Sequence, residues 1–289
     1  MDIICKNARF VACNISTSQI INKYHIGKIV DNNFYITPCD AIYLYVKGKI
    51  KPLDLNGLKD IMEKLFDDDI YLYYVYEILK NKGYYVKNEG NKFYFKRKIK
   101  EKYSIPVILV REKEVINFSQ VYNELPAIFI TVDEEKSVTY FHADYIDPYG
   151  YVNDEINVKN VEKIDNVYYT PDEAPEWFGE SFHSIKILND FEANYVTNTM
   201  KSNEDLLYND LIKRKFIVKS GFKYGQHFRI YARSMNDHAE YLVSFIDSEE
   251  WYKISRAIRL SISVRKDTIF AGFINGAVKY IKIERLKDI

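Results

Sequence analysis

The chain has 289 residues, of which 47% are hydrophobic, so it is long enough to bury a sizeable core and to form roughly two domains. Its 41 basic residues balance 41 acidic ones, and a net charge of zero gives by itself no support for a nucleic-acid partner. The three cysteines form no Cys-x-x-Cys pair and the five histidines are scattered. We therefore expect no disulfide scaffold, no metal site and no cofactor.

The amino end reads MDIICKNARFVAC, where Asp2 and Lys6 interrupt the apolar run that a signal peptide needs. The longest apolar stretches, AIYLYV and IPVILV, have the length of strands and not of membrane spans. We therefore expect a soluble, cytoplasmic protein without a membrane segment.

Three sequence similarities recur along the chain in the same order and at nearly constant spacing. YITPCDA at 35–41 resembles YYTPDEA at 168–174, and LKNKGYYVK at 79–87 resembles LIKRKFIVK at 211–219. SVTYFHADYI near Val138 resembles AVKYIKIERL near Val278. This pattern predicts a tandem duplication, with chance similarity in a tyrosine-rich chain as the alternative.

The duplication predicts an α+β fold in which each repeat has two parts. A small N-terminal α/β subdomain is followed by a larger domain, whose mixed sheet is flanked by helices. We place the first repeat at 1–68 and 69–145. The second repeat follows as a linker and small subdomain at 146–200 and a larger domain at 201–289.

The first repeat lacks the polar side chains in which the second is richest. Lys96 falls at the position of Tyr231, and no histidine occurs between Lys96 and Val115, the counterpart of the segment that holds His238. Opposite SVRKDTIF the first repeat reads LPAIF, without a basic residue. We therefore predict that the first repeat is degenerate.

In the second repeat, Ser202 with Asp205 three residues later indicates a capping box that opens a helix through NEDLLYNDLIKR. FIVK is then a predicted strand and SGFKYG a loop. In HFRIYAR the alternation puts Phe228 and Ile230 on one face and a basic, polar set on the other. That second set is His227, Arg229, Tyr231 and Arg233.

The rest of the repeat predicts a strand, a helix and a hairpin. EYLVSFI is typical of a buried strand. YKISRAIRLSI places Ile254, Ile258 and Ile262 at helical spacing, with basic residues on the other sides. The dipeptide Asn275-Gly276 predicts a tight turn before AVKYIKIERL.

Basic residues concentrate locally although the net charge is zero. Residues 211–233 hold seven basic side chains and residues 251–266 hold five, and no carboxylate interrupts either run. The acids gather elsewhere, in DEE at 133–135 and PDEAPEW at 171–177. The basic runs are typical of a surface that binds phosphates, with two ordinary solvated faces as the alternative.

Tyrosine, histidine and lysine without a carboxylate cage favour phosphoryl transfer at RNA over metal-assisted hydrolysis, because divalent ions prefer oxygen ligands. A base would take the proton of a ribose 2′-hydroxyl, and that oxygen would attack the adjacent phosphate. An acid would protonate the departing 5′-oxygen while a cation stabilises the added charge. From the residues alone, Tyr224 and His227 compete with Tyr231 and His238 for these roles.

The segments GFKYGQHFRIY, DHAEYLV and ISRAIRLSISVRKDTIFA resemble the catalytic domain of archaeal tRNA-splicing endonucleases, over about residues 206–286. The resemblance implies Tyr231 as the general base, His238 as the general acid and Lys266 as the cation of the transition state. It also implies that Arg259 and Arg285 stack around a bulged base. Lys223 and Arg229 are our further candidates for RNA binding.

The resemblance is to the two-repeat form of these enzymes. It implies that the larger domain of each repeat is nuclease-like, that the one at 201–289 is catalytic and the one at 69–145 is dead, and that each chain has one active site and pairs into a homodimer. The loop VDEEKS at 132–137 is similar to the acidic loop that docks into a neighbouring subunit in that family. The implied substrate is precursor tRNA with a bulge-helix-bulge structure, cut without metal.

Two other functions remain open at this point. A non-catalytic RNA-binding or scaffold subunit would need the basic residues but neither a base nor an acid. A metal-dependent nuclease is disfavoured by the lack of carboxylates between Trp251 and Lys266.

Overall fold

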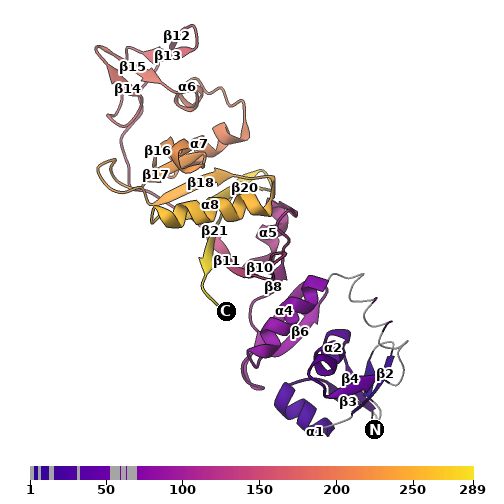
Figure 1. Cartoon of the computed structure of the whole chain (residues 1–289). Coiled ribbons are helices and arrows are strands. Elements are labelled where there is room, and N and C mark those ends of the chain that lie inside the picture. Colours follow the sequence, from indigo (N-terminus) through magenta and orange to yellow (C-terminus); the bar gives the residue numbers. More distant parts are fainter. Residues whose placement is uncertain are drawn as a thin grey trace. The chain divides into compact units, whose positions relative to one another are not determined.

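The structure is a computed structural model, and it describes residues 3–5, 8–12, 16–30, 33–52, 59, 63 and 70–289 (Figure 1). The chain divides into two compact units. The first comprises Met1–Glu112, Ala127–Tyr140 and Lys287–Ile289, and the second comprises Lys113–Pro126 and Phe141–Leu286. Within the described ranges, the helices are all too short or too polar to cross a bilayer.

The first unit begins with a five-stranded sheet in the order β3-β4-β1-β2-β5. The capping box of Thr37 and Asp40 fixes the start of its helix α2, since each residue bonds the backbone N–H of the other. The elements are β1 (Ile3–Cys5), β2 (Ala8–Ala12), α1 (Thr17–Gln19) with the π-helix Ile20–Tyr24, β3 (Lys28–Val30), β4 (Asn33–Ile36), α2 (Pro38–Val46) and β5 (Ile50–Pro52).

The same unit continues with helix α4 and a mixed sheet in the order β6-β7-β8-β10. Lys80 of α4 is buried, and its ammonium donates to the carbonyls of Tyr24, His25 and Tyr84. Burial lowers the pKa of Lys80 to about 8, although the charge of Asp40 acts in the opposite direction. The elements are α4 (Ile70–Asn81), β6 (Tyr85–Glu89), β7 (Lys92–Lys96), β8 (Val107–Leu109) and β10 (Ala127–Val132).

The second unit contains a small subdomain and a larger sheet domain. The subdomain is a four-stranded sheet in the order β12-β13-β15-β14 followed by helix α6. Its elements are β12 (Glu162–Ile164), β13 (Val167–Thr170), β14 (Glu180–Phe182), β15 (Ile185–Leu188) and α6 (Asp190–Val196).

The sheet domain of the second unit has the strand order β16-β17-β18-β20-β21-β11. β18 and β20 are parallel, and helix α8 makes the crossover that parallel neighbours require. The elements are α7 (Asn203–Lys213), β16 (Ile217–Ser220), a 3₁₀ turn η2 (Phe222–Tyr224), β17 (Phe228–Tyr231), β18 (Tyr241–Phe245), β19 (Ser248–Glu250), α8 (Trp251–Ser263), β20 (Asp267–Ile274) and β21 (Ala277–Leu286), with β11 (Val138–Ile146) entering from the first unit.

Two helices cover opposite faces of this sheet (Figure 1). Leu207 and Leu211 of α7 pack in one core cluster with Phe228, Ile230 and residues of β18, β20 and β21. Helix α8 packs on β20 and β21 from the other face. The Ser202–Asp205 capping box of α7 and the Asn275-Gly276 turn, with both φ angles positive, are confirmed.

One sequence prediction about α8 is wrong. Ile254 and Ile258 are buried, but Ile262 is 51% exposed and Ser261 takes the next buried position. Residues seven apart on an α-helix point in nearly the same direction, because seven residues make almost two full turns, whereas residues eight apart differ in direction by about 80°. The buried stripe of α8 therefore continues through Ser261 and not through Ile262.

The two halves of the chain repeat one order of elements, which fits the predicted α+β class. The series α4-β6-β7-β8-β9-α5-β10-β11 matches α7-β16-β17-β18-β19-α8-β20-β21, where β9 is Val115–Asn117 and α5 is Phe118–Glu124. The pairings also match, because β6-β7-β8 and β16-β17-β18 are antiparallel while β8–β10 and β18–β20 are parallel. This correspondence supports a duplication.

Candidate active site

Strand register brings the three predicted catalytic residues to one end of the strands in the sheet domain of the second unit, the Tyr231 edge. Tyr231 ends β17, whose Ile230 pairs with Tyr241 at the start of β18. Tyr241 pairs in turn with Asp267, the first residue of β20. His238 lies three residues before β18 and Lys266 one residue before β20. The end of one strand and the entries to two others therefore meet at this edge, as the antiparallel and parallel pairings require.

A hydrogen bond joins Lys266 to the loop that carries His238. The Lys266 ammonium donates to the Ala239 carbonyl at 3.0 Å, and Ala239 directly follows His238. The same loop is closed by Glu240, whose N–H donates to the Ile230 carbonyl at 3.0 Å. Its carboxylate accepts from the Ala232 N–H at 2.7 Å. The loop 232–240 is thus anchored at both ends, while the His238 side chain is exposed to solvent.

Tyr231 is only 7% exposed and packs in a cluster with Ile217, Trp177 and Phe178. On the polar side, the Arg229 guanidinium lies 5.8 Å from the centre of the Tyr231 ring. Arg229 Nε is buried and has no hydrogen-bond acceptor within the described part of the chain. The predicted alternation of β17 is confirmed, because Phe228 and Ile230 belong to the other core cluster. The face of Tyr231 is not the polar face that we predicted, because its ring is buried among apolar side chains.

The register separates the competing tyrosine and histidine from the Tyr231 edge. Ser220 pairs with Phe228, so Tyr224 and His227 lie in the turn that joins β16 and β17, at the end of the hairpin opposite Tyr231. His227 Nδ1 accepts a hydrogen bond from the Phe245 N–H at 3.0 Å. Lys223, predicted to bind RNA, is exposed in the same turn.

The two candidate stacking arginines are both exposed. In the β20–β21 hairpin Ile269 pairs with Lys282, and extending this register by three residues brings Arg285 level with Lys266. Lys282 also forms an ion pair with Asp267 at 2.9 Å, consistent with that register. Arg259 projects from α8, about one turn before the helix ends at Ser263 and seven residues before Lys266. Arg285 thus lies on the strand beside the Tyr231 edge.

A cavity of about 1000 Å³ borders this edge. Residues 233–236 of the His238 loop and Lys219 of β16 line it on one side. Residues 173–177 and 179–181 of the small subdomain line it on the other and bring three exposed glutamates, Glu173, Glu176 and Glu180. Sequence reasoning did not predict this wall. The only signal was the pair Trp177-Phe178, two large apolar residues at the end of an acidic stretch.

In the described ranges, no three His, Cys, Asp or Glu side chains are grouped so that they could hold a metal ion. The chemical groups at the sheet edge are a phenol, an imidazole and an ammonium. Together they can accept a proton, donate a proton and stabilise a negative charge.

Comparison with known proteins identifies the class of this domain. The family profile described as "tRNA intron endonuclease, catalytic C-terminal domain" matches residues 204–280. The match runs from α7 into β21 and includes Tyr231, His238 and Lys266. The sheet domain of the second unit is therefore an endonuclease domain.

Similarity to archaeal proteins named tRNA-splicing endonuclease extends over nearly the whole chain. The protein of Picrophilus torridus is 40% identical over 274 residues, which cover 95% of this chain and 93% of the relative. That of Thermoplasma volcanium is 37% identical over 292 residues, covering 100% and 99%. That of Methanosarcina acetivorans is 24% identical over 350 residues, covering 96% and 97%. The chain belongs to the tRNA-splicing endonuclease family.

Proposed function

We propose that this protein excises introns from precursor tRNA by cutting at bulge-helix-bulge junctions without a metal ion. The meeting of Tyr231, His238 and Lys266 at one sheet edge is the observation that carries the proposal. RNA supplies its own nucleophile in this reaction, so the protein needs to move two protons and stabilise one charge. The membership of the family supports the choice of substrate.

In the proposed mechanism Tyr231 accepts the proton of the ribose 2′-hydroxyl at the cleavage site. The 2′-oxygen attacks the phosphorus, and the bond from phosphorus to the 5′-oxygen breaks. His238 gives a proton to that oxygen as it leaves. The products are a 2′,3′-cyclic phosphate and a 5′-hydroxyl, and each proton transfer contributes about 10²- to 10⁴-fold to the rate.

Lys266 is proposed to stabilise the negative charge on the pentacoordinate phosphate. Its amine is already fixed by one hydrogen bond beside His238 and has two further N–H donors available for phosphate oxygens. A positioned donor of this kind acts on the charge that develops in the transition state.

RNA binding is proposed to use Arg285 and Arg259 as planar cations that stack on a splayed base, since unpaired bases of RNA are recognised by stacking. Arg229 and Lys223 would add attraction for phosphates. Arg285 is the better candidate for stacking, because its strand β21 pairs with β20 and the register places Arg285 level with Lys266 at the proposed cleavage site.

The first repeat is proposed to be a structural copy without activity. Tyr85 pairs with Lys96 in β6–β7 just as Ile217 pairs with Tyr231 in β16–β17, so Lys96 occupies the position of the general base. The Lys96 ammonium donates to the Ile99 carbonyl at 2.8 Å and lies 4.7 Å from the ring centre of Tyr103. These contacts suit a structural role.

Two chains are proposed to pair through the acidic loop at 132–137. Asp133 uses its carboxylate within the loop, where it accepts from the N–H groups of Glu135 and Ser137. The exposed carboxylates of Glu134 and Glu135 are then the groups offered to a neighbouring subunit. Homodimer formation and a cytoplasmic location are both part of the proposal.

The decisive experiment incubates the purified protein with an intron-containing precursor tRNA in excess EDTA and determines the chemistry of the new ends. Cyclic phosphate and 5′-hydroxyl ends at the bulges are expected. Cleavage that requires added magnesium would overturn the metal-free mechanism. Tight binding without cleavage would instead support the alternative, a non-catalytic RNA-binding or scaffold subunit.

A further inference from the structure

The small subdomain forms one wall of the cavity beside Tyr231, and its loop 175–179 packs in the same core cluster as the tyrosine. Trp177 and Phe178 share the core cluster of Tyr231 and Ile217. The position of the phenol ring therefore depends on the loop 175–179 as well as on its own strand.

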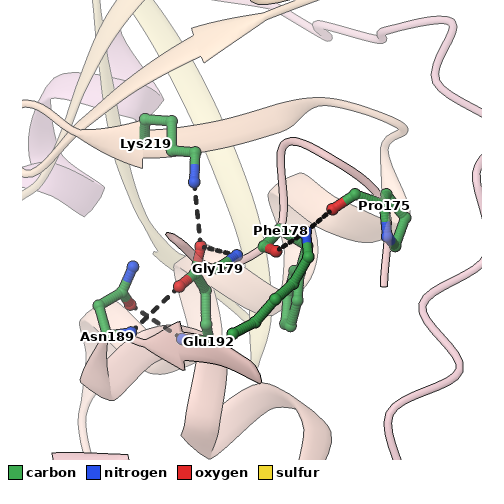
Figure 2. Close-up of polar contacts among 7 residues, drawn as sticks. Pro175, Phe178, Gly179, Asn189, Glu192 and Lys219 are labelled. Atoms are coloured by element: carbon green, nitrogen blue, oxygen red, sulfur yellow. Dashed lines mark hydrogen bonds and ion pairs between the residues drawn. The ribbon is translucent and has the colours of Figure 1, made fainter. Parts of the chain in front are cut away.

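Two polar side chains hold that loop in place (Figure 2). The Lys186 ammonium donates to the carbonyls of Pro175 and Phe178 at 2.6 and 2.9 Å. The Gly179 N–H donates to Glu192 Oε1 at 3.1 Å. Gly179 has φ of +69°, and a Cβ there would come within 3.0 Å of Leu188. These three hydrogen bonds hold the loop, and its backbone requires glycine at position 179.

Glu192 links this loop to the sheet that carries Tyr231. It is 2% exposed, and the same Oε1 atom that binds Gly179 accepts from the Lys219 ammonium at 3.2 Å (Figure 2). Its Oε2 accepts from the Asn189 N–H at 3.1 Å in the capping box of α6. Lys219 lies on β16 two residues beyond Ile217, the register partner of Tyr231.

We propose that Glu192 is a positioning residue for the cleavage reaction: through Gly179 and Lys219 it holds the Trp177–Phe178 wall against β16 and so fixes the ring of Tyr231. This inference rests on the proposed role of Tyr231 as the base. Glu192 lies in the core and not in the cavity wall, so it acts on Tyr231 and not on the RNA.

The substitution Glu192→Gln tests the proposal with little change in shape. A carboxylate offers two acceptor atoms, whereas an amide offers one oxygen and an NH₂ group. The NH₂ group of the glutamine must therefore face either the Asn189 N–H or the Gly179 N–H and the Lys219 ammonium, all of which are donors themselves. Lys219 also loses its counter-charge. Because a misplacement of about 1 Å costs about 100-fold in rate, we expect the rate constant of the cleavage burst, which is the first turnover at saturating RNA, to fall by about 10- to 100-fold.

Lys219 gives an independent route to the same contact. Lys219→Met should lower the rate as Glu192→Gln does, and Lys219→Arg, which keeps a charged donor, should restore it to within about threefold of the unchanged protein. The double variant Glu192→Gln/Lys219→Met should be no slower than either single one, because residues of one contact are not additive. Glu173→Gln is the matched control, since it removes an exposed carboxylate from the same cavity.

The readout must separate positioning from folding. A loss of folded protein lowers the amplitude of the cleavage burst, whereas a misplaced base lowers its rate constant and leaves RNA affinity unchanged. The positioning role would be overturned, and the proposed base kept, if Tyr231→Phe is inactive while Glu192→Gln and Lys219→Met both have rate constants within about twofold of the unchanged protein. Full activity of Tyr231→Phe would overturn the proposed base and this inference together. If Glu192→Gln does not fold, the Lys219→Met and Lys219→Arg pair decides.

Discussion

Replacing Lys266 by glutamine separates the charge of this residue from its hydrogen bond. Among the described residues the Lys266 side chain makes one polar contact, the 3.0 Å bond to the Ala239 carbonyl, and a glutamine NH₂ can donate to the same oxygen. A partly exposed hydrogen bond of this kind contributes about 1 kcal/mol to stability, so the melting temperature should fall by no more than about 2–4 °C.

The catalytic effect of the same change should be much larger. Loss of a positioned group that stabilises the transition-state charge costs about 3 kcal/mol, which corresponds to a rate lower by about 10²- to 10³-fold. Single-turnover cleavage of a labelled precursor tRNA at saturating protein measures this rate, and a filter-binding titration measures RNA affinity.

The matched control is Lys279→Gln. Lys279 is exposed on β21 and pairs with Gly272, about 20 Å along the strand from the level of Lys266. This substitution removes one positive charge from the same sheet, and it should leave the cleavage rate within about twofold of that of the unchanged protein. Equal rates for Lys266→Gln and Lys279→Gln would refute the role of Lys266 as the cation of the transition state.

Three further results are expected. His238→Ala should reduce cleavage by orders of magnitude at unchanged RNA affinity, because the exposed imidazole is the proposed proton donor; full activity would remove it as the acid. Lys96→Gln should leave turnover nearly unchanged, and a large loss would show that the first repeat takes part in catalysis. Since burial holds the pKa of Lys80 near 8 against 10.5 in the unfolded chain, the folded state releases this proton first and gains stability as pH rises. The stability of the unchanged protein relative to Lys80→Met should therefore rise by about 2 kcal/mol between pH 8 and pH 10. Hydrogen exchange of the amides at 70–89 measures this difference in stability between the two proteins. A difference that stays constant over this pH range would contradict the lowered pKa of Lys80.

Local features of the second repeat could be predicted from the sequence because each depends on neighbours a few residues apart. The capping box of Ser202 and Asp205 and the turn at Asn275-Gly276 are of this kind. The error at Ile262 arose because residues eight apart were counted as one stripe, although their directions on the helix differ.

Features that depend on register or on distant packing could not be predicted in the same way. The residues alone left Tyr224 and Tyr231 as competitors, and the pairing of β16 with β17 separates them. The contact of Glu192 with Lys219 joins residues from different subdomains. Glutamates usually lie at the surface, and nothing in the sequence around Glu192 indicates that this one is buried.

Strand β9 and helix α5 have a consequence for any attempt to isolate the catalytic half. These elements precede residue 146, yet β9 pairs with β19 and the Phe118 ring lies where a Cβ on Gly272 would come within 2.4 Å of it. A fragment that starts at 146 would expose an unpaired strand edge and an apolar socket, both of which favour aggregation. A chain nicked after residue 146 should instead hold its two pieces together without a covalent link, so a split version of this protein is best made by expressing both halves at once.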